Sequence, residues 1–225
     1  MNVPLEQTEP FYVKNCSLAA IATGLRANSL SEFRDKLMTI DEGCIYHHFW
    51  GGRMKPQFVH PQYHNDFASW AYHRLNDHVL AEKLNIIDPT EFESLEMLRQ
   101  EVLEKVEQRL DNCEIILWTK KEDSFHFIRS ILIVFESETS IPEPRDLPAV
   151  IKLLSPSSIF YHFIDARGRT VEKMDDFSVW LKMFGHKYED LIESIQSIDP
   201  YFFSLTQIRD EIAKTTQNYF AKETS

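Results

Sequence analysis

The stretch from Cys44 to Trp70, CIYHHFWGGRMKPQFVHPQYHNDFASW, decides how we interpret the fold, because much of it recurs from Ser158 to Trp180, as SIFYHFIDARGRTVEKMDDFSVW. Its opening block, CIYHHF, aligns without a gap with SIFYHF, which begins 114 residues later. Its closing block, Asn65-Asp66-Phe67-Ala68-Ser69-Trp70, aligns with Asp175-Asp176-Phe177-Ser178-Val179-Trp180. The pattern predicts that the chain is an internal duplication of one helical unit.

The duplication predicts a division into two halves. Residues 1–112 form repeat 1, a helical half, and residues 113–225 form repeat 2, a strand hairpin followed by a helical half. The offset between copies falls from 114 to 110 residues between the two blocks, which places a shorter loop in the second copy. Loops tolerate such length changes. No Gly/Ser-rich or long Pro-rich linker separates the halves, so we expect them to pack as one globule about an approximate twofold axis.

Several helix boundaries are marked by residue type and spacing. Ser29 and Glu32 have the S-x-x-E spacing of a capping box and precede apolar residues at helical spacing, which predicts a helix over residues 30–40. Asn65 or Asp66 stands where a helix N-cap is expected. Ser94 precedes a long amphipathic helix that we expect to end near residue 110.

Strand signals are fewer. Residues 11–23 are compatible with strand or helix, whereas residues 124–135 predict a strand. A hairpin of residues 114–118 and 125–135 would join the copies, and the prolines within residues 136–148 predict a surface connection. The expected fold class is α+β, helix-dominated, with two pseudo-twofold-related repeats, each a short strand region followed by four to five helices.

Composition limits the classes of partner. The 225 residues carry 35 acidic and 24 basic side chains, a net charge of -11, which disfavours binding to nucleic acid or to acidic membranes. The longest apolar run, residues 131–135, is far shorter than the roughly 20 residues of a membrane helix. An acidic, proline-containing N-terminus and cysteines without C-x-x-C spacing predict a cytoplasmic protein with reduced, buried thiols.

Both copies retain the same ordered set of polar and aromatic side chains. In the structural interpretation, the aspartates cap helices, the aromatic residues fill the core, and each histidine bridges a cap or a backbone carbonyl. In the functional interpretation, the two sets face each other and bind an anionic or polyhydroxylated small molecule, or a metal. The candidate ligand-binding residues are His48, Arg53, Asp66, Trp70, His162, Arg167, Asp176 and Trp180.

A second possible metal set occurs in the first half alone. His60, His64 and Asp66 have the spacing H-x3-H-x-D, but Pro61 interrupts any helix that would align the histidines. We therefore predict no metal site and interpret these histidines as surface loop residues. His47, His73, His78, His126 and His186 show no ligand spacing. Catalytic residues and cofactors stay unknown at this point, because no nucleophile elbow, P-loop or dinucleotide fingerprint is present.

The sequence also resembles a known family. The run ATGLRA at residues 22–27, the IYHHF and NDFASW blocks, Ile87-Asp88-Pro89, and SIFYHFIDAR at residues 158–167 are similar to an uncharacterised prokaryotic family of about this length. The second half has no counterpart of the Thr-Gly and Arg-Ala pairs, so a role for Arg26 would belong to one half. The resemblance implies no established activity. Families of this kind sometimes occur beside carbohydrate-active enzymes such as glycosyltransferases and trehalose-forming enzymes.

These observations lead to two functional hypotheses. The first is a non-catalytic cytoplasmic binding or scaffolding protein, for a protein partner or for a small anionic or carbohydrate ligand. It follows from a repeated motif set without a nucleophile or a cofactor signature. The second is a metal-assisted or sugar-related enzyme that uses the paired His and Asp residues. Either protein could form a homo-oligomer.

Overall fold

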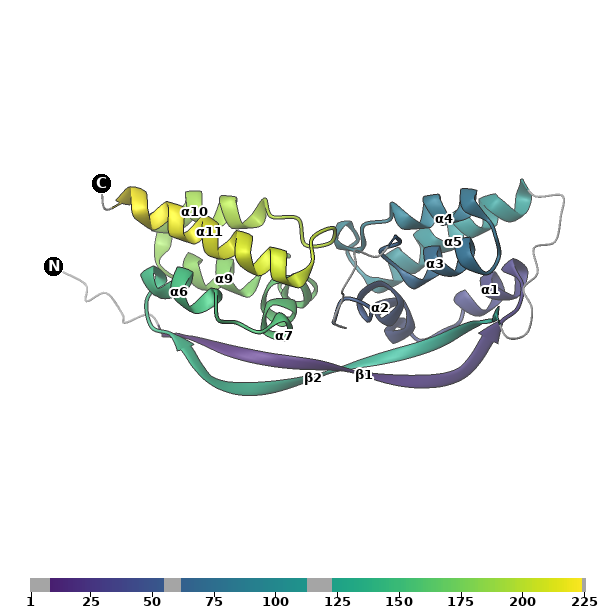
Figure 1. The fold of residues 1–225 in the computed structure, drawn as a ribbon, viewed down its shortest axis with the longest axis horizontal. Coiled ribbons are helices and arrows are strands. Elements are labelled where there is room, and N and C mark those ends of the chain that lie inside the picture. Colours follow the sequence, from purple (N-terminus) through teal and green to yellow (C-terminus); the bar gives the residue numbers. More distant parts are fainter. Residues whose placement is uncertain (1–8, 55–61, 113–122, 224–225) are drawn as a thin grey trace. The chain divides into compact units, whose positions relative to one another are not determined.

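The computed structural model describes residues 9–54, 62–112 and 123–223. The fold is α+β and helix-dominated, as predicted, with two long strands that form an antiparallel two-stranded sheet (Figure 1). The chain divides into two compact units, a contiguous unit of Leu18–Leu132 and a composite unit of Met1–Ser17 with Ile133–Ser225. This division differs from the expected boundary between residues 112 and 113, because the N-terminal segment belongs with the C-terminal helices.

The strands are longer than predicted. β1 spans Phe11–Ala27 and β2 spans Phe125–Ile141, each 17 residues. The sequence pattern predicts short strand regions and a surface connection over residues 136–148, but β2 continues to Ile141. Pairing with β1 satisfies the backbone groups of this polar, largely exposed end of β2. The predicted partner of residues 125–135 in a hairpin, residues 114–118, lies outside the described residues, so the hairpin stays a prediction. Among the described residues, β2 pairs with β1.

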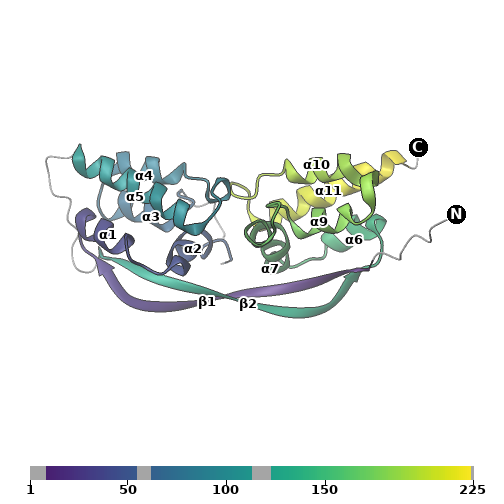
Figure 2. The same cartoon turned by 180° about the vertical axis from the view of Figure 1, so that it is seen from behind.

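In the contiguous unit, helices cover one face of the local sheet segment, as Figures 1 and 2 show from opposite sides. A tight aromatic cluster joins these helices to β2. The Phe33 ring on α1 lies 5.2 Å from Phe125 and 5.6 Å from Phe67, between ring centroids. The elements after β1 are α1 (Leu30–Leu37), α2 (Glu42–Trp50), α3 (Asp66–His73), α4 (His78–Asn85), the 3-10 turn η1 (Pro89–Glu91) and α5 (Leu95–Asp111).

The predicted helix starts in this unit are confirmed. The Ser29 hydroxyl accepts the backbone N–H of Glu32 at the start of α1, although the Glu32 carboxylate reaches the N–H of Asn28 rather than that of Ser29. Ser94 caps α5 by accepting the N–H of Met97, and α5 ends at Asp111, close to the predicted end.

In the composite unit, the N-terminal part of β1 completes the core of the C-terminal helices. The Phe11 ring lies 5.0 Å from Phe177 and 5.8 Å from Trp180, between centroids. The helical elements are η3 (Pro144–Asp146), α6 (Leu147–Ile151), α7 (Pro156–Ile159), the π-helical turn η4 (Phe160–Asp165), α8 (Ala166–Arg169), α9 (Asp176–Lys182), η5 (Gly185–Tyr188), α10 (Glu189–Gln196) and α11 (Leu205–Glu223).

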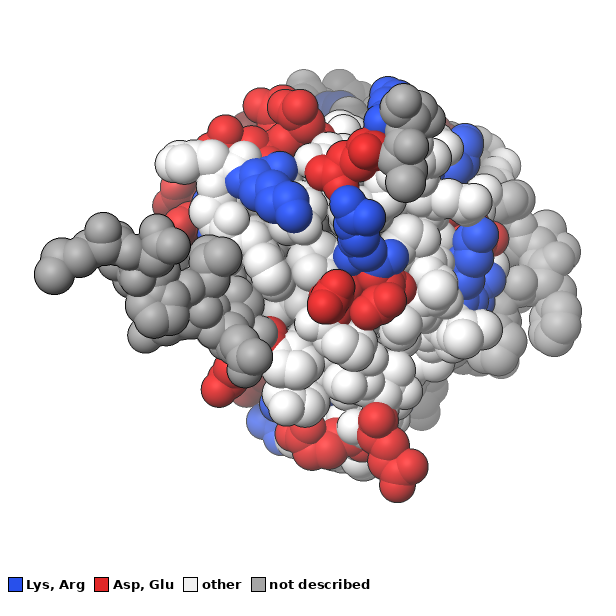
Figure 3. All heavy atoms as spheres, turned by 90° about the vertical axis from the view of Figure 1, so that its left-hand side faces the viewer, with Lys and Arg blue, Asp and Glu red and all other residues white. Residues whose placement is uncertain are grey.

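Surface charge and hydropathy bear on the predicted partners. On the face drawn in Figure 3, Lys and Arg side chains lie beside Asp and Glu side chains, with uncharged surface between them. The excess negative charge is therefore not spread as one uniform layer over this face. None of the helices within the described ranges is long and apolar enough to cross a membrane.

Candidate functional site

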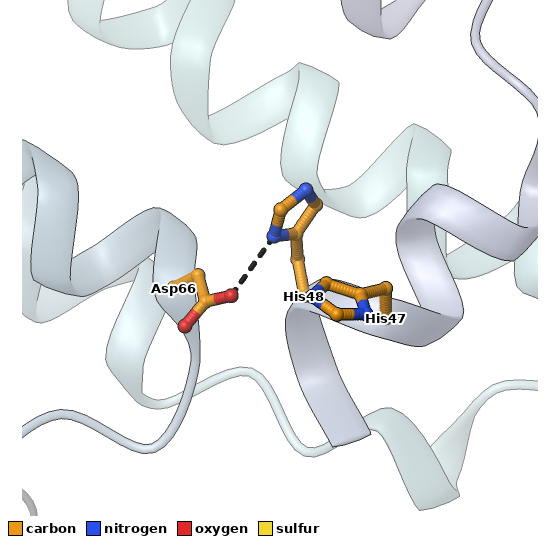
Figure 4. Close-up of side chains that lie close together, drawn as sticks. All are labelled: His47, His48 and Asp66. Atoms are coloured by element: carbon orange, nitrogen blue, oxygen red, sulfur yellow. Dashed lines mark hydrogen bonds and ion pairs between the residues drawn. The ribbon is translucent and has the colours of Figure 1, made fainter. Parts of the chain in front are cut away.

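In the contiguous unit, His48 on α2 joins helix, loop and strand. Its ring is buried, with 3% of the residue exposed. The backbone N–H of Ile128 in β2 donates to Nε2 at 3.2 Å, so Nε2 carries no proton and the imidazole is neutral, with its proton on Nδ1. That Nδ1–H donates to Oδ2 of Asp66, the first residue of α3, at 2.9 Å. Figure 4 shows the ring turned toward this carboxylate.

The other motif residues of this unit make separate contacts. The indole N–H of Trp70 donates to the backbone carbonyl of Asp123 at 3.0 Å, two residues before β2 begins. The guanidinium of Arg53 lies over the Trp50 ring, 5.7 Å from its centroid. The predicted set is thus brought together as a His48–Asp66 pair with a nearby structural tryptophan.

The composite unit repeats the same bonds with different chain segments. The backbone N–H of Lys14 in β1 donates to His162 Nε2 at 2.8 Å, and His162 Nδ1–H donates to Asp176 Oδ2 at 2.7 Å. The indole N–H of Trp180 donates to the carbonyl of Glu9 at 2.9 Å. In each unit the histidine thus accepts the N–H of the fourth strand residue, and the tryptophan donates to the carbonyl two residues before the strand.

Two arginines follow the histidine motif of the composite unit, and the first, Arg167, is the counterpart of Arg53. The Nε–H of Arg167 donates to the carbonyl of Phe163, and its guanidinium lies over that ring, 4.7 Å from the centroid. Arg169 forms an ion pair with Asp176 at 3.0 Å, a contact that the sequence analysis did not assign. The Asp176 side chain is 20% exposed, whereas that of Asp66 is 51% exposed.

The structural interpretation of the aspartates was wrong in one respect. The helix caps are Asn65 and Asp175, whose side chains accept the N–H groups of Ala68 and Ser178. Asp66 and Asp176 are the next residues and bind the histidines instead. The histidines likewise accept a strand N–H rather than bridging a carbonyl.

Asp175 is a carboxylate inside the protein core. It is fully buried and accepts hydrogen bonds from Ser178 Oγ at 2.7 Å and from Gln196 Nε2 at 2.5 Å. Burial, the largest cause, raises the pKa of Asp175, against the opposing hydrogen bonds of Ser178 and the charge of Arg167.

One group in the described ranges has the spacing of possible metal ligands. Ligand atoms of His47, His48 and Asp66 lie within 4.8 Å of one another. However, both ring nitrogens of His48 are already engaged, and His47 Nδ1 lies 2.7 Å from Ser130 Oγ in β2. A metal ion would have to replace the proton on His48 Nδ1, so these residues fit a metal only at the expense of the His48–Asp66 bond.

The predicted H-x3-H-x-D set is not assembled as a ligand group. His60 lies outside the described residues, and the backbone N–H of His64 donates to Asn85 Oδ1. Asp66 pairs with His48 instead.

Sequence reasoning missed His47, which is buried beside β2 although it shows no ligand spacing. It also missed the strand amides, since every residue type except proline supplies a backbone N–H. The expectation that both motif sets line one ligand pocket stays a prediction.

The fold and this geometry define a class of helix-dominated α+β proteins in which a buried histidine, paired with an aspartate, binds the backbone of a long strand. Residues 8–217 match the family described as "Family of unknown function (DUF5752)", and the chain belongs to that family. The expected prokaryotic family of unknown function is thereby confirmed.

The comparison with solved structures gives a similar fold. The chain is similar to "The structure of OrfY from Thermoproteus tenax", an archaeal protein, with 27% sequence identity and a TM-score of 0.79. The alignment covers 94% of this chain and 96% of that chain. No curated protein matches the chain.

Proposed function

We propose that the chain is a non-catalytic cytoplasmic binding protein that recognises a protein partner. The observation that carries this proposal is the engagement of both ring nitrogens of each motif histidine. His48 and His162 each accept a strand N–H and donate to an aspartate. A general base or a metal ligand needs an available nitrogen lone pair, and here that lone pair holds a strand in place.

The same contacts support the proposed duplication of one unit. β1 and β2 have the same length and nearly the same order of buried and exposed positions. His48 and His162 make equivalent bonds to β2 and β1, and the two tryptophans make equivalent bonds to carbonyls. If the repeated residues stabilise the fold of each unit, the binding surface is expected among the residues that differ between the units.

The rival function is a metal-assisted enzyme, and the group of His47, His48 and Asp66 is the observation in its favour. Purified protein can be titrated with Zn²⁺ and analysed for bound metal. We expect no stoichiometric zinc at neutral pH. One equivalent of zinc that is lost in both His47→Ala and Asp66→Asn would favour the enzyme.

The direct test of a binding function uses the full chain as bait. The immobilised protein should retain one protein from an extract of the cells that express it, and the two purified proteins should re-form a complex of fixed stoichiometry. A chain that binds no protein in this assay would contradict the proposal, and one that instead retains or converts a carbohydrate or an anionic metabolite would favour a small-molecule ligand or an enzyme.

A further inference from the structure

An open groove runs along α5 in the contiguous unit. It encloses a volume of about 540 Å³ and is bordered by the end of α1 and by the residues that precede α5. α5 spans 17 residues, or about 25 Å at 1.5 Å rise per residue, long enough to contact several turns of another helix.

Four of the residues that line the groove are apolar: Met38, Phe92, Met97 and Leu103. Met38 is 57% exposed and Met97 is 48% exposed. Methionine side chains adapt to varied apolar surfaces, and exposed methionines are common where a protein binds amphipathic helices.

The charged residues that line the groove are all acidic. They are Glu96, Glu101, Glu104 and Glu107, with no Lys or Arg among the lining residues. Arg99 pairs with Glu96 at 3.0 Å, and Lys105 pairs with Glu101 at 2.7 Å but lies 4.0 Å from Glu104.

Arg99 and Lys105 therefore offset two of the four carboxylates around the groove, those of Glu96 and Glu101. The remaining negative charge is that of Glu104 and Glu107. A partner with positive charge on this side would be attracted to these exposed carboxylates, and salt would weaken the attraction.

The corresponding face of α11 in the composite unit has different chemistry. In the sequence alignment that matches Ser94 with Ser204, Met97 corresponds to Gln207 and Glu104 to Lys214. The position of Met38 is taken by Lys152, which donates to Gln217 at 2.9 Å. A hydrogen bond from Lys152, just after α6, to Gln217 of α11 therefore lies where the contiguous unit has an apolar, acidic groove.

We infer that the α5 groove binds a basic amphipathic helix of a partner protein. This inference deepens the proposed binding function and rests on it. The apolar residues of the partner helix, spaced at i, i+3, i+4 and i+7, contact the Met and Phe side chains that line the groove, and its Lys or Arg residues contact Glu104 and Glu107.

The test uses a fluorescein-labelled 18-residue peptide of Leu and Lys with one apolar face, and a scrambled peptide of the same composition. Fluorescence anisotropy measures binding to the full chain. We expect at least tenfold tighter binding of the amphipathic peptide, and weaker binding at high ionic strength. The double change Glu104→Lys and Glu107→Lys should weaken it at least tenfold.

Controls separate groove binding from general attraction to an acidic protein. Met97→Asp adds negative charge but removes an apolar contact, so it should weaken binding several-fold. Asp210→Lys with Glu211→Lys makes the same charge change on α11 and should leave binding unchanged, as should Thr206→Asp. Equal loss in the α11 double variant, unchanged binding in Met97→Asp, or equal affinity for the two peptides would overturn the inference.

The two proposals fail differently. If a captured partner protein binds the Glu104→Lys, Glu107→Lys variant as tightly as wild type, the groove inference is wrong and the binding function stands. If no protein partner is captured, the binding function itself is contradicted.

Discussion

The contiguous and composite units make the same contacts between strand and helices, but with different residues at a few positions. Each fastens a strand to its helices through a neutral histidine, and each caps the helix after the motif loop. The cap is an amide in one unit, Asn65, and a buried carboxylate in the other, Asp175. Thiol and hydroxyl are exchanged too, since Cys16 and Cys44 align with Ser130 and Ser158. Shared residues thus report what the fold requires, and unshared residues show where the units can diverge.

The largest effect is expected from removing either histidine. His48→Ala and His162→Ala should each lower the free energy of unfolding by about 4 kcal/mol, because a cavity forms and a buried strand N–H loses its acceptor. Urea unfolding of the full chain measures both losses. Glutamine places an amide oxygen near the position of Nε2, so His48→Gln should lose less than His48→Ala. A negligible loss for one histidine alone would break the equivalence of the units.

The next effect concerns the amide cap. Asn65 Nδ2 donates to the carbonyl of Leu84 at 2.9 Å. Asn65→Asp would place a carboxylate oxygen against that carbonyl in a buried site, and we expect a loss of about 3 kcal/mol in the free energy of unfolding. Stability equal to wild type at neutral pH would show that the two caps are interchangeable.

The reverse exchange should have a smaller effect of opposite sign. Asp175→Asn removes a buried charge while keeping the cap oxygen, and Gln196 can rotate its amide to match. We expect a gain on the order of 1 kcal/mol at neutral pH.

The pH dependence of this gain follows from the pKa of Asp175, which burial raises in the folded state. The stability that protonated Asp175 contributes is fully present below the ordinary pKa of about 3.9 and is lost as the pH rises through the raised folded pKa. The advantage of Asp175→Asn should therefore grow from pH 4 toward neutral pH. Unfolding midpoints at several pH values measure it, and an advantage that is constant with pH would contradict this assignment.

The smallest effect concerns the reactivity of the Cys16 thiol rather than the stability of the fold. Burial, with Asp165 adding to it against Arg169, raises the pKa of the Cys16 thiol to about 12. Cys16 also donates to the carbonyl of Ser157. We expect Cys16 to react with a disulfide reagent at pH 8 far more slowly in the folded chain than in urea, as measured by mass spectrometry of the labelled peptide. Equal rates in both states would place this end of β1 in solvent.

Local structure was largely predictable from the sequence. Ser29 and Ser94 mark helix starts because their hydroxyls replace missing backbone acceptors, and this preference is visible in one residue and its spacing. The choice between Asn65 and Asp66 as cap was not predictable, since both residue types cap well. Only the position of His48 shows that Asp66 is engaged elsewhere.

Long-range pairing was not predictable. His162 binds the backbone of Lys14, 148 residues away, and a backbone N–H leaves no mark in the sequence. For the same reason the whole of β1 was predicted to belong to the first half, although its N-terminal part belongs to the composite unit. The groove along α5 was also missed, because methionine and glutamate at helical spacing are typical of an ordinary amphipathic helix.

The protonation of the two motif histidines tests the account most directly. Long-range ¹H–¹⁵N correlation spectra of the ¹⁵N-labelled full chain, assigned with His48→Gln and His162→Gln, distinguish the two neutral tautomers. We predict that both rings carry their proton on Nδ1 at neutral pH and that neither signal changes when Zn²⁺ is added. A proton on Nε2 of either ring, or a zinc-dependent shift of His48, would show that these nitrogens are available for chemistry rather than committed to the fold.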